Sequence, residues 1–196
     1  EFRGTISSQT AGLKVITFDG AAGGRTTLRA ADGVIADGAG QVAVVQASAT
    51  SPLELYGVST YTGGTTIQNG GLVRITADSG LGGAAGALTL DNGTLDYRPA
   101  SAASLERDLV LGDGGGTIVI GTSAVNMTGQ ISGTGGFTKS GATALTLSGE
   151  NTYTGGTTVN QGNILISSDS NLGHASGGVT LNGGNIQFAA NIETTR

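Results

Sequence analysis

The sequence predicts an all-β chain wound into a parallel β-helix, on three observations. A seven-residue phrase recurs almost unchanged 92 residues later (153 − 61 = 92), as YTGGTTI at residues 61–67 and YTGGTTV at residues 153–159. Glycine supplies 37 of the 196 residues and separates short runs in which Val, Ile, Leu or Thr stand at alternate positions. Aliphatic residues also return about every 22 residues, the length of one β-solenoid coil. Repetition, alternation and this period together indicate stacked coils of short strands.

The first part of the chain, residues 1–46, follows this rhythm loosely, and we expect degenerate coils there. Its apolar runs predict short strands, because each run is bounded by a glycine-rich turn. The expected strands are residues 13–18, 25–29 and 42–46, and the expected turns are residues 20–24 and 37–40.

Two copies of a longer repeat follow, at residues 53–97 and 137–188. Because the side chains of a strand alternate between its two faces, the apolar residues of these runs should point inward. The inward set is Leu53, Leu55, Ile67, Leu145, Leu147, Val159, Ile164 and Ile166. The outward set is Glu54, Gln68, Thr146 and Asn160, together with Leu165, which lies between two inward residues.

Residues 98–136 should form the coils between the two copies. Pro99 closes the first copy, because proline cannot donate a hydrogen bond to a strand ladder. Residues 100–108 are the only helix-compatible segment, with a loop as the equal alternative. The expected strands are residues 109–111, 117–120, 124–127 and 130–131. At about 22 residues per coil, the whole chain 1–196 would be a single β-helix of roughly nine coils.

The recurring phrase supplies the candidate functional residues, which we expect to be the structural core of the repeat. They are Tyr61, Gly63, Gly64, Thr65 and Thr66 in the first copy, and Tyr153, Gly155, Gly156, Thr157 and Thr158 in the second. A glycine pair allows a positive φ at a corner, and the threonine pair restarts a strand. The two tyrosines would then pack on the outside of the corner. A ligand loop is the alternative, but periodic recurrence favours a scaffold over a single site.

The composition excludes several classes of function. A net charge of −5, with a pI of about 4.6, argues against a nucleic-acid partner, which needs a clustered basic face. The absence of cysteine excludes a disulfide framework and a thiolate metal site. No apolar run reaches 18 residues, so we expect no transmembrane helix. We also find no signal peptide, and we expect the chain to be an excised fragment.

Catalytic, metal and cofactor sites are not expected. Asp113 lies in a glycine-rich run that superficially resembles a calcium-binding repeat, but that site needs stacked aspartates and a turn fits better. Asp78 and Asp169 occupy the same repeat position, where an Asx-turn would place them, several coils apart and too distant for paired acid–base chemistry. His174 is the only histidine and should be an exposed turn residue.

The second copy resembles a known family. Residues 138–141 (TKSG), the strand 145–147 and residues 151–158 (NTYTGGTT) follow the pattern of the autotransporter-associated β-strand repeat, also called the passenger-associated transport repeat. The first copy departs from this pattern. Val58-Ser59 replaces Glu150-Asn151, and residues 46–49 (QASA) stand where the TKSG start should be.

The resemblance implies a right-handed parallel β-helix from the passenger of a type V secreted bacterial surface protein. It implies a non-enzymatic stalk, anchored at the outer membrane by a translocator outside this chain, whose repeats help the passenger to fold and reach the cell surface. As a virulence factor in cell adhesion, the parent would contact host matrix or host cells. Two alternatives stay open: a surface that is itself adhesive or self-associating, and a β-helical polysaccharide-degrading enzyme. The enzyme would need clustered carboxylates and basic residues, which the sequence does not show.

Overall fold

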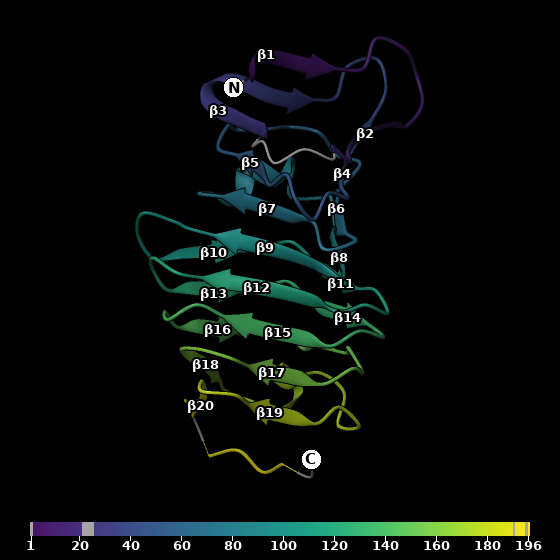
Figure 1. The fold of residues 1–196 in the computed structure, drawn as a ribbon. Coiled ribbons are helices and arrows are strands. Elements are labelled where there is room, and N and C mark those ends of the chain that lie inside the picture. Colours follow the sequence, from purple (N-terminus) through teal and green to yellow (C-terminus); the bar gives the residue numbers. More distant parts are fainter. Residues whose placement is uncertain (1, 21–25, 190, 195) are drawn as a thin grey trace.

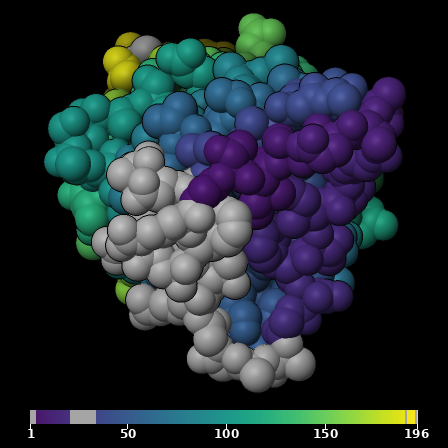
Figure 2. Space-filling model, turned by 90° about the horizontal axis from the view of Figure 1, so that it is seen from above, coloured from purple at the N-terminus to yellow at the C-terminus, as the bar shows by residue number. Residues whose placement is uncertain are grey.

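The protein is an all-β parallel solenoid whose coils stack along one axis (Figure 1). The computed structural model describes residues 2–20, 26–189, 191–194 and 196. The N-terminal strands lie at one end of the stack and the C-terminal strands at the other. Seen from the N-terminal end, the first described residues (purple) cover part of the top, and later coils show at the rim (Figure 2).

Three parallel sheets form the sides of the solenoid within the described residues. The nine-stranded sheet contains β1 (Phe2–Ser7), β3 (Thr26–Ala36), β5 (Leu53–Leu55), β7 (Leu72–Ile75), β9 (Gly93–Tyr97), β12 (Gly116–Ile120), β15 (Phe137–Ser140), β17 (Thr157–Val159) and β19 (Val179–Leu181). The six-stranded sheet contains β2 (Lys14–Phe18), β4 (Val42–Gln46), β6 (Thr65–Gln68), β8 (Leu88–Asp91), β11 (Leu109–Leu111) and β14 (Ile131–Gly133). The five-stranded sheet contains β10 (Ala103–Leu105), β13 (Val125–Met127), β16 (Leu145–Leu147), β18 (Asn163–Ile166) and β20 (Asn185–Phe188).

The register stacks equivalent residues of successive coils into columns that run along the axis. One inward column of the nine-stranded sheet is Leu53, Val73, Leu95, Ile118, Lys139 and Val159. Its aliphatic members are fully buried, and they form part of a continuous core. Each coil thus covers the apolar face of the one before it, which is how a solenoid buries surface without a globular core.

The alternation of apolar residues predicted the inward face correctly. All eight residues assigned to the inward set are buried, with exposed fractions of 1% or less. Glu54 corrects the outward set, because it is only 5% exposed. The Nη1 of Arg74 donates to its carboxylate at 2.6 Å and covers it. Leu165 is half-buried, not exposed.

The expected number of nine coils is not confirmed, since the chain makes about 7 turns. The period of about 22 residues holds from the first repeat copy onward. Before it the turns are longer: Thr5 pairs with Val34, 29 residues further along (34 − 5 = 29). The longer N-terminal turns consume residues without adding coils.

Two local expectations also need correction. Residues 100–108 contain no helix; Ala103–Leu105 is strand β10, which pairs with β13. The expected strand 25–29 is part of the longer strand Thr26–Ala36, and residue 25 lies outside the described residues. The strands Val42–Gln46 and Leu109–Leu111 have the predicted bounds.

Candidate functional site

The tyrosine of each recurring phrase lies inside the solenoid. Tyr61 and Tyr153 are both fully buried, so the expectation that they pack outside the corner is wrong. Their rings lie against a glycine one turn later. A Cβ added to Gly82 would lie 2.9 Å from ring carbons of Tyr61, and one added to Gly173 would lie 2.9 Å from those of Tyr153. The corner therefore forms around the ring, and only glycine leaves room for it.

The buried hydroxyl of each tyrosine is hydrogen-bonded to a threonine of the same phrase. The distance between the hydroxyl oxygens is 2.6 Å both for Tyr61 and Thr65 and for Tyr153 and Thr157. Burial raises the pKa of each tyrosine to about 12. Each threonine hydroxyl also donates to a backbone carbonyl in the next turn, at 3.4 Å from Thr65 to Leu81 and 3.3 Å in the second copy. The threonines thus link the tyrosine to the following coil.

The glycine pair makes the corner as the sequence indicated. The second glycine of each pair has a positive φ, +83° at Gly64 and +82° at Gly156. The first glycine touches the preceding coil, because a Cβ on Gly63 would lie 2.6 Å from the Val42 carbonyl oxygen. After the corner, Thr66 and Thr158 are half-buried in β6 and β17.

The recurring aspartates begin two short 3₁₀ helices, η1 (Asp78–Leu81) and η2 (Asp169–Leu172). Their carboxylates bind arginines rather than forming the expected Asx-turn. Arg107 is fully buried, and its Nε donates to Asp78 Oδ1 at 2.6 Å. Its other nitrogens donate to the backbone carbonyls of Asp78, Leu81, Gly82 and Gly86 at 2.9–3.2 Å.

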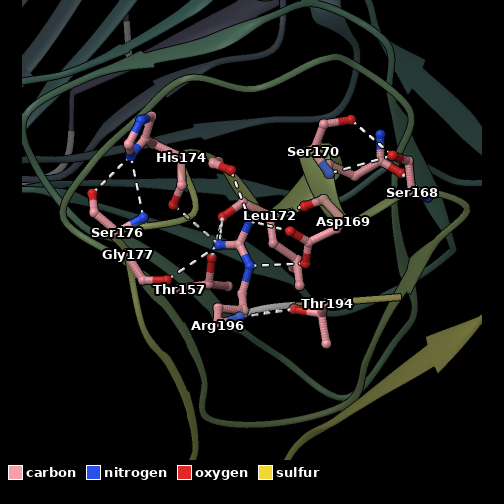
Figure 3. Close-up of polar contacts among 12 residues, drawn as sticks. Thr157, Ser168, Asp169, Ser170, Leu172, His174, Ser176, Gly177, Thr194 and Arg196 are labelled. Atoms are coloured by element: carbon pink, nitrogen blue, oxygen red, sulfur yellow. Dashed lines mark hydrogen bonds and ion pairs between the residues drawn. The ribbon is translucent and has the colours of Figure 1, made fainter. Parts of the chain in front are cut away.

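The second copy repeats this arrangement around Arg196 (Figure 3). The Nε of Arg196 donates to Asp169 Oδ1 at 2.9 Å, which contributes to holding the pKa of that carboxyl below its usual value. Its other nitrogens donate to the backbone carbonyls of Asp169, Leu172, Gly173, His174 and Gly177 at 2.8–3.2 Å.

A buried lysine lies one coil before the second phrase. Lys139 occupies the aliphatic column between Ile118 and Val159 and is fully buried. Its Nζ donates to the carbonyl oxygens of Ser140, Gly141 and Gln161 at 2.9, 2.6 and 3.1 Å. Three acceptors match the three donors of an ammonium group. Burial lowers the pKa of Lys139 to about 8.

Gln46 holds the corresponding position before the first phrase. It pairs with Ile67 as Lys139 pairs with Val159, and it is fully buried. Its Nε2 donates to the carbonyl oxygens of Ser48 and Ser51 at 3.2 and 2.8 Å. Its Oε1 is buried without a hydrogen-bond partner. In the structure, Gln46 therefore occupies the position that corresponds to Lys139. The sequence offset of 92 residues would instead align Lys139 with Ala47.

In the second copy, two asparagines add further hydrogen bonds between coils. Asn151 is buried, accepts from the backbone N–H of Ile131 at 2.7 Å and donates to the carbonyl of Asn171 at 2.6 Å. Asn171 in turn donates to the Gly149 carbonyl at 2.9 Å. In the first copy, Ser59 makes only the first of these contacts, accepting from the N–H of Ile35 at 3.2 Å.

The remaining candidates do not form a chemical site. Asp113 is exposed and accepts a hydrogen bond from the Thr134 hydroxyl. His174 is exposed and its Nδ1 lies 2.8 Å from the Ser176 hydroxyl. Across the described ranges, no group of three or more His, Cys, Asp or Glu residues could hold a metal ion. In the same ranges, no helix has the length and apolar character needed to cross a membrane.

Sequence reasoning missed Arg107 and Arg196, and it missed the burial of Lys139 and Gln46. The arginines had a weak signal, since each follows a recurring aspartate at a similar distance, 29 residues for Arg107 and 27 for Arg196. Lys139 had a stronger one, because it stands two residues after Phe137 in a strand and so shares its inward face.

Comparison with known proteins supports the resemblance seen in the sequence. Residues 53–73 and 137–166 match the passenger-associated transport repeat. The chain is 35% identical over 130 residues to the adhesin BmaC autotransporter of Brucella suis biovar 1 (strain 1330). That match covers 66% of this chain and 4% of the relative, so the chain spans a small part of the relative's length. No solved structure matches the chain significantly.

Proposed function

Since this chain is a β-solenoid segment of an autotransporter passenger related to an adhesin, we propose that it is a non-enzymatic stalk whose repeats promote folding and transport of the passenger. We take residues 1–46, 53–97, 98–136 and 137–188 as successive parts of this one solenoid, and right-handed winding belongs to the same proposal.

The observation that supports this role is that the buried polar side chains of the second copy have hydrogen-bond partners within the solenoid. Tyr153, Thr157, Asn151 and Lys139 are buried and bond to their own or neighbouring coils. Polar groups arranged in this way stabilise one packing of the chain and present nothing to a substrate. The repeats thus have the features of a folding element rather than of a catalytic or ligand site.

The local nature of the contacts supports a role in transport. Partners in the second copy lie about one coil apart, such as Lys139 and Gln161 with 22 residues between them in numbering. Short sequence separations keep the entropy cost of loop closure low and favour rapid folding. A coil that folds quickly outside the membrane would hinder the return of the emerging chain and would template the next coil.

Deletion in the parent protein tests this role. Removing residues 129–188 should reduce the amount of passenger displayed on the cell surface, measured by surface proteolysis and antibody labelling at matched expression. The control removes as many coils from a part of the stalk without the repeat, and it should reduce display less. Equal display of the two deletions would leave this segment as a spacer and would remove the transport role.

A second function rests on the relative, which is named an adhesin. In the parent protein, the passenger would be exposed at the cell surface, anchored in the outer membrane by a translocator, and would contact host matrix or host cells. We place that contact in the parent as a whole, with adhesion or self-association by this segment as the alternative. Binding of the isolated chain to matrix-coated surfaces, compared with the whole passenger, separates these two cases.

A further inference from the structure

We propose that residues 78–86 and residues 169–177 are guanidinium-binding sites, each occupied in the folded chain by an arginine from the following coil. We call them the first and second cradle. Both lie outside residues 53–73 and 137–166, the segments that match the transport repeat. This inference goes beyond the transport role and holds whether or not the repeats assist secretion.

The two cradles use corresponding atoms. In each, an aspartate accepts through its carboxylate and its backbone carbonyl, and the carbonyls of a Leu-Gly pair and of a later glycine complete the ring of acceptors. The first cradle is Asp78, Leu81, Gly82 and Gly86, and the second is Asp169, Leu172, Gly173 and Gly177, with His174 added. A constellation that forms twice in one chain, around different arginines, is a property of the turn.

The acceptors suit a guanidinium better than other cations. Guanidinium is planar and offers five N–H donors in a fixed fork, whereas an ammonium group is a compact charge with three donors. Arg107 uses all three of its nitrogens against acceptors on four residues. The single carboxylate of each cradle balances the single positive charge of a guanidinium, but it would not balance the two charges of a divalent metal ion.

Burial makes occupation of the cradle stabilising for the folded state. The side chain of Arg107 is 0% exposed and that of Arg196 is 5% exposed. Without the arginine, the buried carbonyls of Gly82 and Gly86, and of Gly173 and Gly177, would lose the donor that they have in the folded chain. Unpaired buried polar groups are costly. When the arginine is replaced by a small residue, the cradle should therefore bind another guanidinium.

Each cradle is also connected to the buried tyrosine. The Leu81 carbonyl accepts from both Arg107 Nη1, at 3.0 Å, and Thr65 Oγ1, at 3.4 Å, and Thr65 is bonded to Tyr61. Leu172 links Arg196 and Thr157 in the same way, as Figure 3 shows for its carbonyl. Filling the cradle therefore fixes the carbonyl to which the tyrosine–threonine pair is attached.

Chemical rescue tests the proposal on the purified chain. Arg107→Ala and Arg196→Ala should each lower the thermal midpoint of unfolding, and millimolar ethylguanidinium should restore part of the loss. Urea, which has a similar shape without charge, and tetramethylammonium, which has charge without donors, should not. The matched control is Arg98→Ala, because Arg98 also bonds to an aspartate, Asp96 at 2.9 Å, but is 48% exposed. Ethylguanidinium should leave this control and the wild-type chain unchanged.

A second readout keeps the test informative if Arg107→Ala does not fold. Arg196 contacts only the last turns, so Arg196→Ala should fold, with faster hydrogen exchange at the amides of Gly173 and His174 that ethylguanidinium slows again. Arg107→Lys and Arg196→Lys should fail to recover the wild-type midpoint. The proposal is overturned if lysine restores the midpoint, if urea rescues as well as ethylguanidinium, or if the rescue is equal in Arg98→Ala.

Discussion

The two repeat copies share one corner but hold it with different polar partners. Both bury a tyrosine against a glycine and both close a turn on an arginine. The phrase of the first copy is preceded by Gln46, which leaves a buried oxygen unpaired, whereas the phrase of the second copy is preceded by Lys139, whose amine donates to three carbonyls. The second copy also matches the family over the longer segment, residues 137–166 against 53–73. The corner is the constant part of the repeat, and the polar partners determine how completely it is closed.

The copies also use different sides of the solenoid. In the first copy, the phrase leads into β6 of the six-stranded sheet, and in the second it leads into β17 of the nine-stranded sheet. Between the two phrases, a coil contributes one strand to each of the three sheets, as β9, β10 and β11 do. At the second phrase, β15, β16 and β17 belong to only two sheets, because β15 and β17 are both in the nine-stranded sheet. The repeat is therefore a local motif that does not depend on one particular face.

The largest expected effect does not distinguish the copies, because it acts on the core that they share. Ile75→Asp and Ile166→Asp each place a charge at a position no more than 1% exposed. Each should lower the free energy of unfolding by several kcal/mol, since an unpaired buried charge is poorly tolerated. Val110→Asp, at a position 37% exposed, is the control and should stay near wild type in urea unfolding. A large difference between the two isoleucine variants would show that the cores are not equivalent.

A smaller effect should separate the copies. Asn151→Ser gives the second copy the residue of the first and removes the bond to the Asn171 carbonyl. We expect a loss of about 1–3 kcal/mol, the usual cost of leaving a buried acceptor unpaired. Ser59→Ala removes a longer hydrogen bond, 3.2 Å against 2.6 Å, and should cost less. Urea midpoints of the two variants give the comparison, and an equal loss would mean that the asparagine pair adds nothing to closure.

Between pH 8 and pH 10, the pH dependence of stability should arise in the second copy. Burial lowers the pKa of Lys139 to about 8, below the value of 10.5 for an ordinary lysine. Between these values the unfolded chain binds more protons than the folded chain, so stability rises with pH, by roughly 1 kcal/mol from pH 8 to pH 9. Lys139→Gln copies the first repeat and should abolish the rise. Unfolding should be measured below pH 10, where the tyrosines do not titrate. At higher pH their raised pKa would lower stability.

Much of the solenoid follows from the sequence because strand periodicity is a local property. Alternation identified Leu53, Ile67 and Ile166 as inward without any knowledge of the partner strands. It failed for the tyrosines, since they lie in a corner where side chains do not alternate. It also gave Glu54 the wrong exposure, because the covering Arg74 lies 20 residues away.

The cradles were beyond sequence reasoning for a related reason. Their acceptors are mostly backbone carbonyls, which every residue has, and only the three-dimensional turn brings them together. The arginine that binds them comes from another coil, 29 residues later in the first cradle. A recurring aspartate therefore indicated a repeated position, but not the cation that it binds.

The central claim is that the second copy, whose buried polar groups are more completely hydrogen-bonded, is the stronger folding unit. Pulsed hydrogen exchange during refolding tests this claim most directly. The amides of Thr157 and His174 report the second copy, and those of Thr65 and Gly83 report the equivalent bonds of the first. We predict that the second pair gains protection before the first, and that Asn151→Ser together with Lys139→Gln removes the difference. Simultaneous protection of both pairs in the wild-type chain, or earlier protection of the first, would contradict the account.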